Sequence, residues 1–345
     1  MKLSHQTIEL NPTHPFVIAR GGYSHHRNVI VRLTDEDGIE GYGEAAPNRY
    51  YGESVSTVIA ALGQFKPVLE RADPFSLESI ESHLNRVLRG NASAKGAVSS
   101  ALHDLVGKRL GLPVFRLWGL DASTTPESSF TIAIAENHEL EMRVAEARDY
   151  PILKIKLGTD RDEAILKTVR DATDKPLRVD ANAGWTRERA LQMLPVLQAY
   201  GVEFVEQPLP PDDLEGLAAL RRCGTLPIVV DESCLVAADI PRLSGIVDGI
   251  NIKLAKCGSL REALRMIATA RAHAMLVMVG CMIETSLGIT AAAHFTPLVD
   301  AADLDGAALT ANDPFTGATI DGGQIRLPTG PGLGVRRRSG HAGNG

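Results

Sequence analysis

Cysteine is scarce in this chain of 345 residues, and its cysteines form no paired motif. Cys223, Cys234, Cys257 and Cys281 are scattered without a C-x-x-C spacing. This pattern argues against a disulfide framework or a zinc site and is typical of reduced thiols in a cytosol. The sequence also lacks an apolar run of about 18 residues, the length needed to span a membrane, and the segment MKLSHQTIEL lacks the apolar core of a signal peptide. We therefore expect a cytoplasmic protein without a membrane partner.

Positive charge is not concentrated in the body of the chain. The formal net charge is −6 and no basic stretch offsets it, so we expect no nucleic-acid partner. The one basic cluster, Arg336, Arg337 and Arg338, lies in the Gly-rich sequence VRRRSGHAGNG, which we interpret as a frayed, solvated terminus. Hydrophobic residues make up 44% of the chain and charged residues 23%, as in ordinary globular proteins.

Polar residues follow short apolar runs at a regular interval. They are Lys156 after PILKI, Asp180 after LRV, Glu206 after VEFV, Asp231 after PIVV, Lys253 after GINI, Cys281 after MLVMVG and Asp303 after LVDAA. Successive positions are 24, 26, 25, 22, 28 and 22 residues apart, by subtraction. The interval matches one strand, one helix and two loops, the repeat of a parallel β/α barrel of about 250 residues, in which the carboxyl ends of the strands carry the active site. The sequence thus predicts an α/β fold of the TIM-barrel type.

The N-terminal part has a different organisation. NVIVRLTDEDGIEGYGEA reads as two strands around a turn at Asp35–Gly38, which is a hairpin signal. Helical patterns follow at about 54–70 and 92–110, and the alternation of strands and helices begins only near residue 130. Strands first and helices second predict a separate α+β domain over about residues 1–120, packed closely against the barrel.

Three carboxylates end successive strands of the expected barrel. Asp180, Glu206 and Asp231 should therefore lie side by side at one rim. Crowded carboxylates repel one another unless a cation neutralises them. Mg²⁺ is the usual hard ion for such oxygen ligands. The alternative is that each carboxylate caps the helix that follows it, but three in register favour one Mg²⁺ ion.

Two lysines share a face of one strand. Lys154 and Lys156 lie two residues apart, so Ile155 points to the opposite face. If Ile155 packs against the helices, both ammonium groups enter the mouth of the barrel. There they should depress each other's pKa and move one lysine toward a general base. The alternative is a solvated edge strand.

A third lysine completes a two-base geometry. Lys156 ends the second strand and Lys253 the sixth, which are opposite positions in a ring of about eight strands. Bases on opposite sides of a bound substrate can remove a proton from one face and return one to the other. This is the geometry of a racemase or an epimerase. We interpret Lys256 as a surface residue in the following loop.

Asp303 and Asp305 form an acidic pair at the last strand end. Two carboxylates on one face would attract a cation of the substrate, such as an ammonium group. The alternative is a polar turn before Gly306, and the spacing alone does not decide between them.

Taken together, these segments resemble the enolase superfamily, in its muconate-lactonizing subgroup. The matching segments are LKIKLG, DANAGW, VEQPLP, VDES, INIKLAKCGS and GCMIETSLGITAAAHF, in one order over nearly the whole chain. Enzymes of this superfamily combine a Lys or His base with Mg²⁺ and stabilise an enediolate. The resemblance implies a modified TIM barrel over residues 121–314 with an N-terminal α+β capping domain, residues 1–120, completed by residues 315–345.

Within the subgroup the chain resembles the dipeptide epimerases, the group that includes L-Ala-D/L-Glu epimerase. The D-x-D of Asp303 and Asp305 is similar to their clamp on the α-ammonium of the dipeptide, and HPFVIARGGYS and RYYGES are similar to their substrate-covering loops. The resemblance implies metal ligands at Asp180, Glu206 and Asp231, catalytic lysines at Lys156, Lys253 and Lys154, and substrate contacts at Thr131, Cys281, Asp303 and Asp305. Cys281 would act through its backbone and not as a nucleophile.

The implied reaction inverts the α-carbon of the C-terminal residue by 1,1-proton transfer between two lysines. Ala-Glu-like dipeptides are favoured, and a homo-oligomer is expected from the fold. Arg20 is a candidate for binding a substrate glutamate, and the alternative is a structural ion pair within the cap. Tyr23, Tyr50 and Tyr51 would instead suit an apolar side chain.

Two other functions stay open at this point. The first is another enzyme of the same scaffold: a muconate cycloisomerase, an o-succinylbenzoate synthase or an N-acylamino acid racemase. None of these needs an acidic clamp for a free ammonium group. The second is a non-catalytic binding protein, which has little reason to keep two opposed bases.

Overall fold

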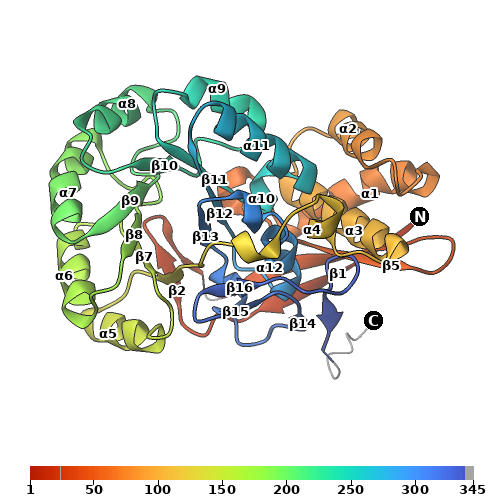
Figure 1. The fold of residues 1–345 in the computed structure, drawn as a ribbon, viewed down its shortest axis with the longest axis horizontal. Coiled ribbons are helices and arrows are strands. Elements are labelled where there is room, and N and C mark those ends of the chain that lie inside the picture. Colours follow the sequence, from red (N-terminus) through yellow and green to blue (C-terminus); the bar gives the residue numbers. More distant parts are fainter. Residues whose placement is uncertain (24, 339–345) are drawn as a thin grey trace.

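The second part of the chain closes into a ring of parallel strands. In this computed structural model, which describes residues 1–23 and 25–338, eight strands pair in chain order from β6 to β13 (Figure 1). Each neighbouring pair is parallel. The last strand returns to the first, because Ser129 N donates to Ala302 O at 3.0 Å and Ser128 forms a parallel bridge with Ala302. The predicted β/α barrel is confirmed.

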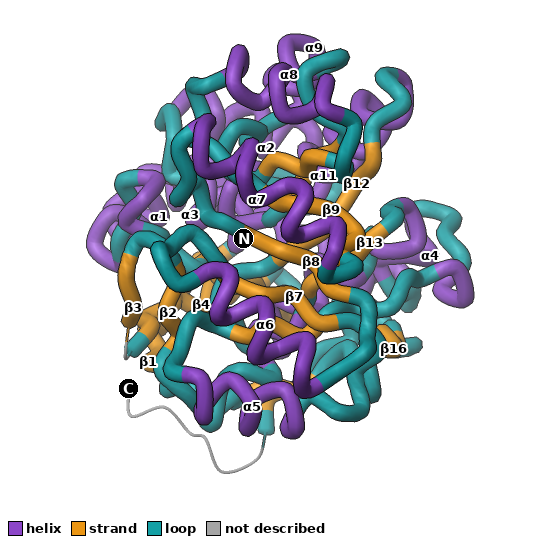
Figure 2. Tube along the Cα trace, turned by 90° about the vertical axis from the view of Figure 1, so that its left-hand side faces the viewer, coloured by secondary structure: helices purple, strands orange, loops and turns teal. Residues whose placement is uncertain are grey.

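The barrel strands are short, and helices follow most of them. The strands are β6 Phe130–Ile132, β7 Leu153–Lys156, β8 Leu177–Asp180, β9 Val202–Glu206, β10 Ile228–Val230, β11 Gly249–Ile252, β12 Leu276–Gly280 and β13 Ala301–Asp303. The helices are α5 Asn137–Glu146, α6 Asp162–Ala172, α7 Arg187–Ala199, α8 Leu214–Cys223, α9 Ile240–Leu243, α10 Leu254–Cys257, α11 Leu260–Ala272 and α12 Ser286–Ala293. Figure 2 shows α5, α6 and α7 side by side over the outside of the strands.

Side chains alternate between the two sides of each strand. On β7, Leu153 and Ile155 are fully buried in the core between strands and helices. Lys154 and Lys156 consequently face the inside of the ring, and both are buried as well. Lys156 ends the second of the eight strands and Lys253 directly follows the sixth. The edge-strand alternative for β7 is therefore wrong.

The N-terminal part is an α+β unit, as predicted. Its antiparallel sheet β1–β4–β5 packs against the long helix α3. The hairpin is confirmed, since Thr34 pairs with Glu40 and Asp35 N donates to Ile39 O at 3.1 Å. The elements are β1 Lys2–Leu10, β2 Phe16–Ile18, β3 Gly21–Tyr23, β4 His26–Thr34, β5 Glu40–Ala45, α1 Val55–Arg71, α2 Leu77–Val87, α3 Ala92–Leu110 and α4 Val114–Leu117. Short 3₁₀ helices are η1 Arg49–Tyr51, η2 Ala122–Thr124, η3 Ala237–Asp239, η4 Thr296–Leu298 and η5 Asp305–Ala307.

A buried carboxylate fastens this cap to the barrel. Glu44, on β5, accepts hydrogen bonds from Thr285 N at 3.1 Å and Gly288 N at 3.0 Å at the start of α12. A negative charge at the N-terminus of a helix is favourable. Asn28, on β4, donates both to Glu44 at 2.7 Å and to Ile283 O at 2.9 Å. The cap is thereby held over the carboxyl ends of the strands.

The C-terminal segment returns to the cap. Leu333 N donates to Asp104 Oδ1 at 2.8 Å, and Val114 N donates to Gly332 O at 2.9 Å. These contacts support our proposed division into a barrel, 121–314, and a cap formed by 1–120 with 315–345. The segment contains β14 Phe315–Thr316, β15 Thr319–Asp321, β16 Gln324–Arg326 and β17 Arg336–Arg337.

The expectation of a frayed terminus is wrong where the structure tests it. Arg336 and Arg337 form a strand that pairs with β14, so their backbone is ordered by hydrogen bonds while their side chains stay exposed. The rest of that prediction concerns residues 339–345, which lie outside the described residues. Among the helices of the described chain, none has the length and apolar character to cross a membrane.

Candidate active site

A cavity of about 370 Å³ lies at the carboxyl ends of the strands, between barrel and cap. The predicted site residues on its wall are Arg20, Thr131, Lys154, Lys156, Asp231, Lys253, Cys281, Asp303 and Asp305. The cap contributes further wall residues, among them Phe16, Ile18, Asn48 and Tyr51. One cavity thus brings together side chains from both ends of the sequence.

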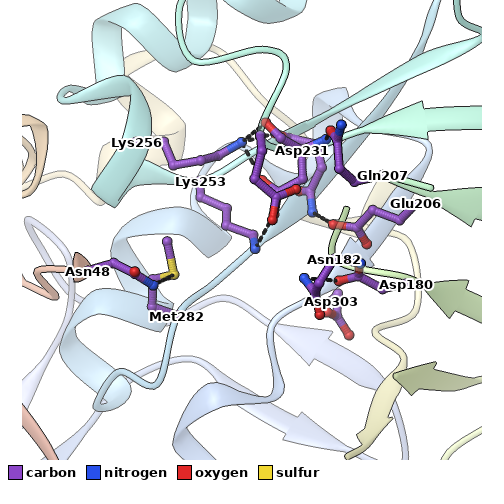
Figure 3. Close-up of polar contacts among 12 residues, drawn as sticks. Asn48, Asp180, Asn182, Glu206, Gln207, Asp231, Lys253, Lys256, Met282 and Asp303 are labelled. Atoms are coloured by element: carbon purple, nitrogen blue, oxygen red, sulfur yellow. Dashed lines mark hydrogen bonds and ion pairs between the residues drawn. The ribbon is translucent and has the colours of Figure 1, made fainter. Parts of the chain in front are cut away.

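Three buried carboxylates lie beside this space (Figure 3). Asp180 ends β8, Glu206 ends β9 in register with it, and Asp231 directly follows β10. Each is at most 1% exposed. The helices after β8 and β9 are capped by other residues, Thr186 and Asp213, so the capping alternative is wrong for Asp180 and Glu206.

Two of these carboxylates are paired with the lysines expected to act as bases. Lys156 Nζ donates to Asp180 Oδ2 at 2.6 Å, and Lys253 Nζ donates to Asp231 Oδ2 at 2.8 Å. Burial opposes the charge of Lys253, but Asp231 and other carboxylates raise its pKa above the ordinary value. The Lys253–Asp231 pair is therefore an ammonium–carboxylate pair in this arrangement.

Lys154 lies between the remaining carboxylates. Its Nζ donates to Asp303 Oδ2 at 2.5 Å and is 2.9 Å from Glu206 Oε2. Burial alone would lower the pKa of Lys154, yet the negative charges of Asp303, Glu206 and Asp180 raise it well above its ordinary value. The expected mutual lowering of the two lysine pKa values is thus wrong for Lys154, because carboxylates from neighbouring strands outweigh its neighbour.

The donor set suits a hard cation. All three carboxylates offer the oxygen ligands that Mg²⁺ prefers. In the part of the chain that the structure describes, no three acidic, His or Cys side chains converge as ligands around one point. Instead, Asp180 and Asp231 point at lysines. Burial and then the charge of Asp180 raise the pKa of Glu206 even though Lys154 lies 2.9 Å from its Oε2, and a divalent ion would add further positive charge there. By donor type and charge, the residues fit Mg²⁺.

The acidic pair at the end of β13 is buried and oriented. Asp303 accepts a hydrogen bond from Ser129 Oγ at 2.7 Å, and Asp305 Oδ2 accepts one from Thr131 N at 2.6 Å. Burial and then Asp303 raise the pKa of Asp305 to about 7. An ammonium group from a substrate would favour the ionised form. Since both carboxyl groups are nearly inaccessible to solvent, a simple polar turn does not describe them.

Cys281 follows β12 and lines the same cavity. Desolvation, Asp305 and Asp303 raise the pKa of its thiol well above the ordinary value. The thiol is therefore neutral and poorly suited to nucleophilic attack, as expected; a role of the Cys281 backbone in binding substrate stays a prediction.

Arg20 is bound to the barrel. Its Nη1 donates to Asn182 O at 2.6 Å and lies 2.7 Å from Glu232 Oε1. Its guanidinium lies 4.2 Å from the centre of the Tyr50 ring. The ion-pair alternative is therefore the observed one, although the partner belongs to the barrel and not, as expected, to the cap. The side chain of Tyr23, the other aromatic candidate of this loop, lies outside those described.

The interpretation of Lys256 as a surface residue is wrong. The side chain is buried, with only 4% of the residue exposed. The short helix α10 turns back beneath the strand ends, so Lys256 Nζ donates to Asp231 O at 2.6 Å and forms an ion pair with Asp231 Oδ1. Helical spacing after a strand does not reveal such a return.

Other residues that support the site were missed. Gln207 Oε1 accepts a hydrogen bond from Asp231 N at 2.9 Å, and Asn251 Nδ2 donates to Glu206 Oε1 at 2.6 Å. Asn251 lies two residues before Lys253, and strand alternation could have placed it on the same inner face. Gln207 has a positive φ of 36°, which no pattern in the sequence signals.

The fold and the site define a two-domain barrel protein of a known family. Residues 3–119 match the model described as mandelate racemase / muconate lactonizing enzyme, N-terminal domain, and residues 137–339 match the model described as enolase C-terminal domain-like. The chain belongs to this family of the enolase superfamily, and the resemblance seen in the sequence is confirmed.

The chain is similar to named epimerases over nearly its whole length. It is 42% identical to the L-Ala-D/L-Glu epimerase of Bacteroides thetaiotaomicron, over 98% of this chain and 88% of that protein. It is 39% identical to the L-Ala-D/L-amino acid epimerase of Maribacter sp., over 97% and 99%. The dipeptide epimerase of Enterococcus faecalis, in complex with Mg and L-Leu-L-Tyr, superposes with a TM-score of 0.92 at 32% identity, over 97% and 98%. Epimerases are isomerases, and the prediction of an enzyme of that class is confirmed.

Proposed function

We propose that the protein is a dipeptide epimerase that inverts the α-carbon of the C-terminal residue of its substrate, with one Mg²⁺ ion as cofactor. The observation that carries this proposal is the placement of Lys156 and Lys253. They follow the second and the sixth strand of the ring and line one cavity. A base on each side of a bound α-carbon is what 1,1-proton transfer requires.

The carboxylates of Asp180, Glu206 and Asp231 would hold the ion. Bound Mg²⁺ would act as a Lewis acid on the terminal carboxylate of the substrate and so make its α-proton more acidic. With the ion bound, Lys156 and Lys253 would be needed less to balance the charge of these carboxylates, so both lysine side chains would be available to the substrate.

The residues of the chain then divide the proton transfer between them. One lysine, after losing its own proton to solvent, takes the α-proton in its neutral form, and the opposite lysine, as an ammonium group, donates a proton to the other face of the α-carbon. Asp303 and Asp305 hold the α-ammonium of the dipeptide, and Thr131 N keeps Asp305 in place. Fixing both ends of the substrate holds the α-carbon between the lysines.

Among dipeptides, we propose that Ala-Glu-like substrates are favoured. Arg27 and Arg49 line the outer part of the cavity together with Arg20, and these cations suit an acidic side chain. Because Arg20 already pairs with Glu232, it would bind a substrate carboxylate only if its guanidinium contacted both carboxylates. Relatives of this chain include both L-Ala-D/L-Glu epimerases and hydrophobic dipeptide epimerases, so the test must span both kinds.

The test is incubation of pooled dipeptides with the protein and Mg²⁺ in D₂O, followed by mass spectrometry. We expect deuterium at the α-carbon of the C-terminal residue, with Ala-Glu among the fastest substrates, and formation of the other epimer. Absence of deuterium uptake from every dipeptide would favour a binding protein. Uptake that needs no free ammonium group would favour another enzyme of the scaffold.

A further inference from the structure

Lys256 lies behind the wall of the cavity and connects the segment after β10 with β11. Its Nζ donates to Asp231 O at 2.6 Å and forms an ion pair with Asp231 Oδ1 (Figure 3). It also donates to Asn251 O at 2.9 Å and to Cys234 O at 3.2 Å. Lys256 is not among the described residues that line the cavity. Any effect of Lys256 on the reaction must therefore pass through another residue.

That residue is Asp231, which bridges two ammonium groups. Its Oδ2 accepts a hydrogen bond from Lys253, a base of the proposed reaction, at 2.8 Å, while Oδ1 pairs with Lys256. Asp231 is 1% exposed, so bulk water screens either contact little. One buried negative charge is shared between a lysine inside the cavity and a lysine behind it.

The backbone contacts alone do not account for a charged side chain at this position. A neutral donor would satisfy the carbonyl oxygens, whereas burying a second ammonium group is costly unless a carboxylate compensates it. When Lys253 turns from Asp231 to a substrate, Lys256 stays as the counter-charge of Asp231. Without Lys256, Asp231 would lose both of its lysine partners when Lys253 leaves, and only the proposed Mg²⁺ would balance its buried charge.

The opposite lysine pair is supported differently. Asp180 Oδ1 accepts a hydrogen bond from Asn182 N at 2.8 Å, and Oδ2 accepts one from Asn182 Nδ2 at 3.1 Å besides that from Lys156. Its second ammonium neighbour, Lys154, is 3.8 Å away. Neutral amide donors thus hold Asp180, and loss of Lys256 should leave this side undisturbed.

We propose that Lys256 is a positioning residue for Lys253. It keeps the charge of Asp231 balanced and its carboxylate fixed, so that Lys253 can leave Asp231 for the substrate. The inference rests on the proposed two-lysine reaction and adds to it a residue that touches no substrate.

The test measures the two proton transfers separately. Exchange of the α-hydrogen in D₂O is followed for each epimer of one dipeptide, and Lys253→Ala and Lys156→Ala assign each epimer to its lysine. Lys256→Gln keeps amide donors for the backbone carbonyls but removes the charge, Lys256→Arg keeps the charge, and Lys256→Met removes both. Lys175 is the matched control, because its Nζ donates to the carbonyls of Ala147 at 3.0 Å and Arg148 at 2.5 Å.

We expect Lys256→Gln to slow exchange at the epimer served by Lys253 by about 10- to 100-fold, the scale of one charge-assisted hydrogen bond. Exchange at the other epimer should change less than about 3-fold, and Lys256→Arg should restore part of the loss. Lys175→Gln should alter neither rate. A crystal structure of Lys256→Gln without substrate should show Lys253 still bound to Asp231.

Three results would overturn the inference while leaving the proposed function intact. They are an equal loss at both epimers, no loss at either, and a crystal structure in which Asp231 has left Lys253. Lys256→Met is the control for purely structural damage, since destabilisation of the fold should slow both proton transfers alike. Absence of exchange in the wild-type protein would instead overturn the proposed function, and the inference with it.

Discussion

The mouth of the barrel has two halves, one around Lys156 and one around Lys253, which have the same arrangement of residues but different charges. On one side Lys156 pairs with Asp180, and on the other Lys253 pairs with Asp231. The inward residue two positions before each base contacts Glu206: Lys154 lies 2.9 Å from Oε2, and Asn251 donates to Oε1 at 2.6 Å. Glu206 is thus held from both halves, by an ammonium group on one side and by an amide on the other.

The difference shows where each half obtains its positive charge. In the Lys156 half the additional ammonium, Lys154, is inside the cavity and also binds Asp303. In the Lys253 half the additional ammonium, Lys256, is behind the wall and, among residues 1–23 and 25–338, binds only Asp231 and backbone carbonyls. In the Lys156 half, Lys154 therefore links the proposed metal ligands to the proposed ammonium clamp. In the Lys253 half, Lys256 supports the proposed base Lys253 alone.

The largest expected effect comes from removing either base. Lys156→Ala and Lys253→Ala should each abolish epimerisation, a loss of at least about 100-fold, because each proton transfer needs its own lysine. Each variant should still exchange the α-hydrogen of one epimer, and the two variants should retain opposite epimers. Chiral chromatography measures inversion, and mass spectrometry in D₂O measures exchange. Full epimerase activity in either variant would contradict the two-base scheme.

A second prediction concerns Asp303 and Asp305, the proposed clamp on the α-ammonium, which should matter equally for proton transfer by Lys156 and by Lys253. Asp303→Asn combined with Asp305→Asn removes the negative charge offered to the α-ammonium, so we expect kcat/KM to fall by about 10- to 100-fold for both epimers alike. A dipeptide acylated at its N-terminus is the matched control, since it should be a poor substrate of the wild type and lose little in the variant. Unchanged turnover of free dipeptides would remove the main support for the dipeptide assignment.

Two glycines allow each half to be disturbed without changing a charged group. A Cβ at Gly280 would lie 2.8 Å from Asn251 Nδ2 and 3.0 Å from Lys253 Cε, while a Cβ at Gly158 would lie 2.5 Å from Ala181 O. We expect Gly280→Ala to displace Lys253 and slow its exchange by about 10-fold, equivalent to about 1.4 kcal/mol.

Gly158→Ala should act mainly on stability. Its φ of +103° is unfavourable for a side chain, so we expect a loss of about 1–3 kcal/mol of unfolding free energy, with slower exchange through the nearby Lys156. Urea denaturation and the two exchange rates distinguish the variants. Equal effects of Gly280→Ala on both epimers would contradict the close contact with Lys253.

The sequence predicts the arrangement that the Lys156 and Lys253 halves have in common better than it predicts the difference in their charged neighbours. Strand spacing and alternation are local properties, and they place Lys156, Lys253 and the three carboxylates at the ends of the correct strands. The surroundings of Lys256 and Arg20 depend on contacts with distant segments, such as Asp231 and Glu232. No local pattern predicts these contacts, and for that reason the sequence places Lys256 on the surface and makes Arg20 a candidate for binding substrate, with an ion pair within the cap as the alternative.

The smallest expected effect on the reaction belongs to Glu284, which should act on the pH dependence of stability in the Lys253 half. Glu284 is buried next to this half, and burial and then Glu44 raise its pKa to about 8, against lowering by Met282 N and Lys253. A carboxyl group whose pKa is raised in the folded state contributes stability that is present below its unfolded pKa and is lost as pH rises through the folded value. The unfolding free energy of the wild type should therefore decline from about pH 5 to about pH 8.5, and it should decline less in Glu284→Gln. Urea denaturation across this range measures the two slopes. Asp305, whose pKa is also raised, to about 7, is present in both proteins and cancels in their difference, so equal slopes would mean that Glu284 is already ionised in the folded protein.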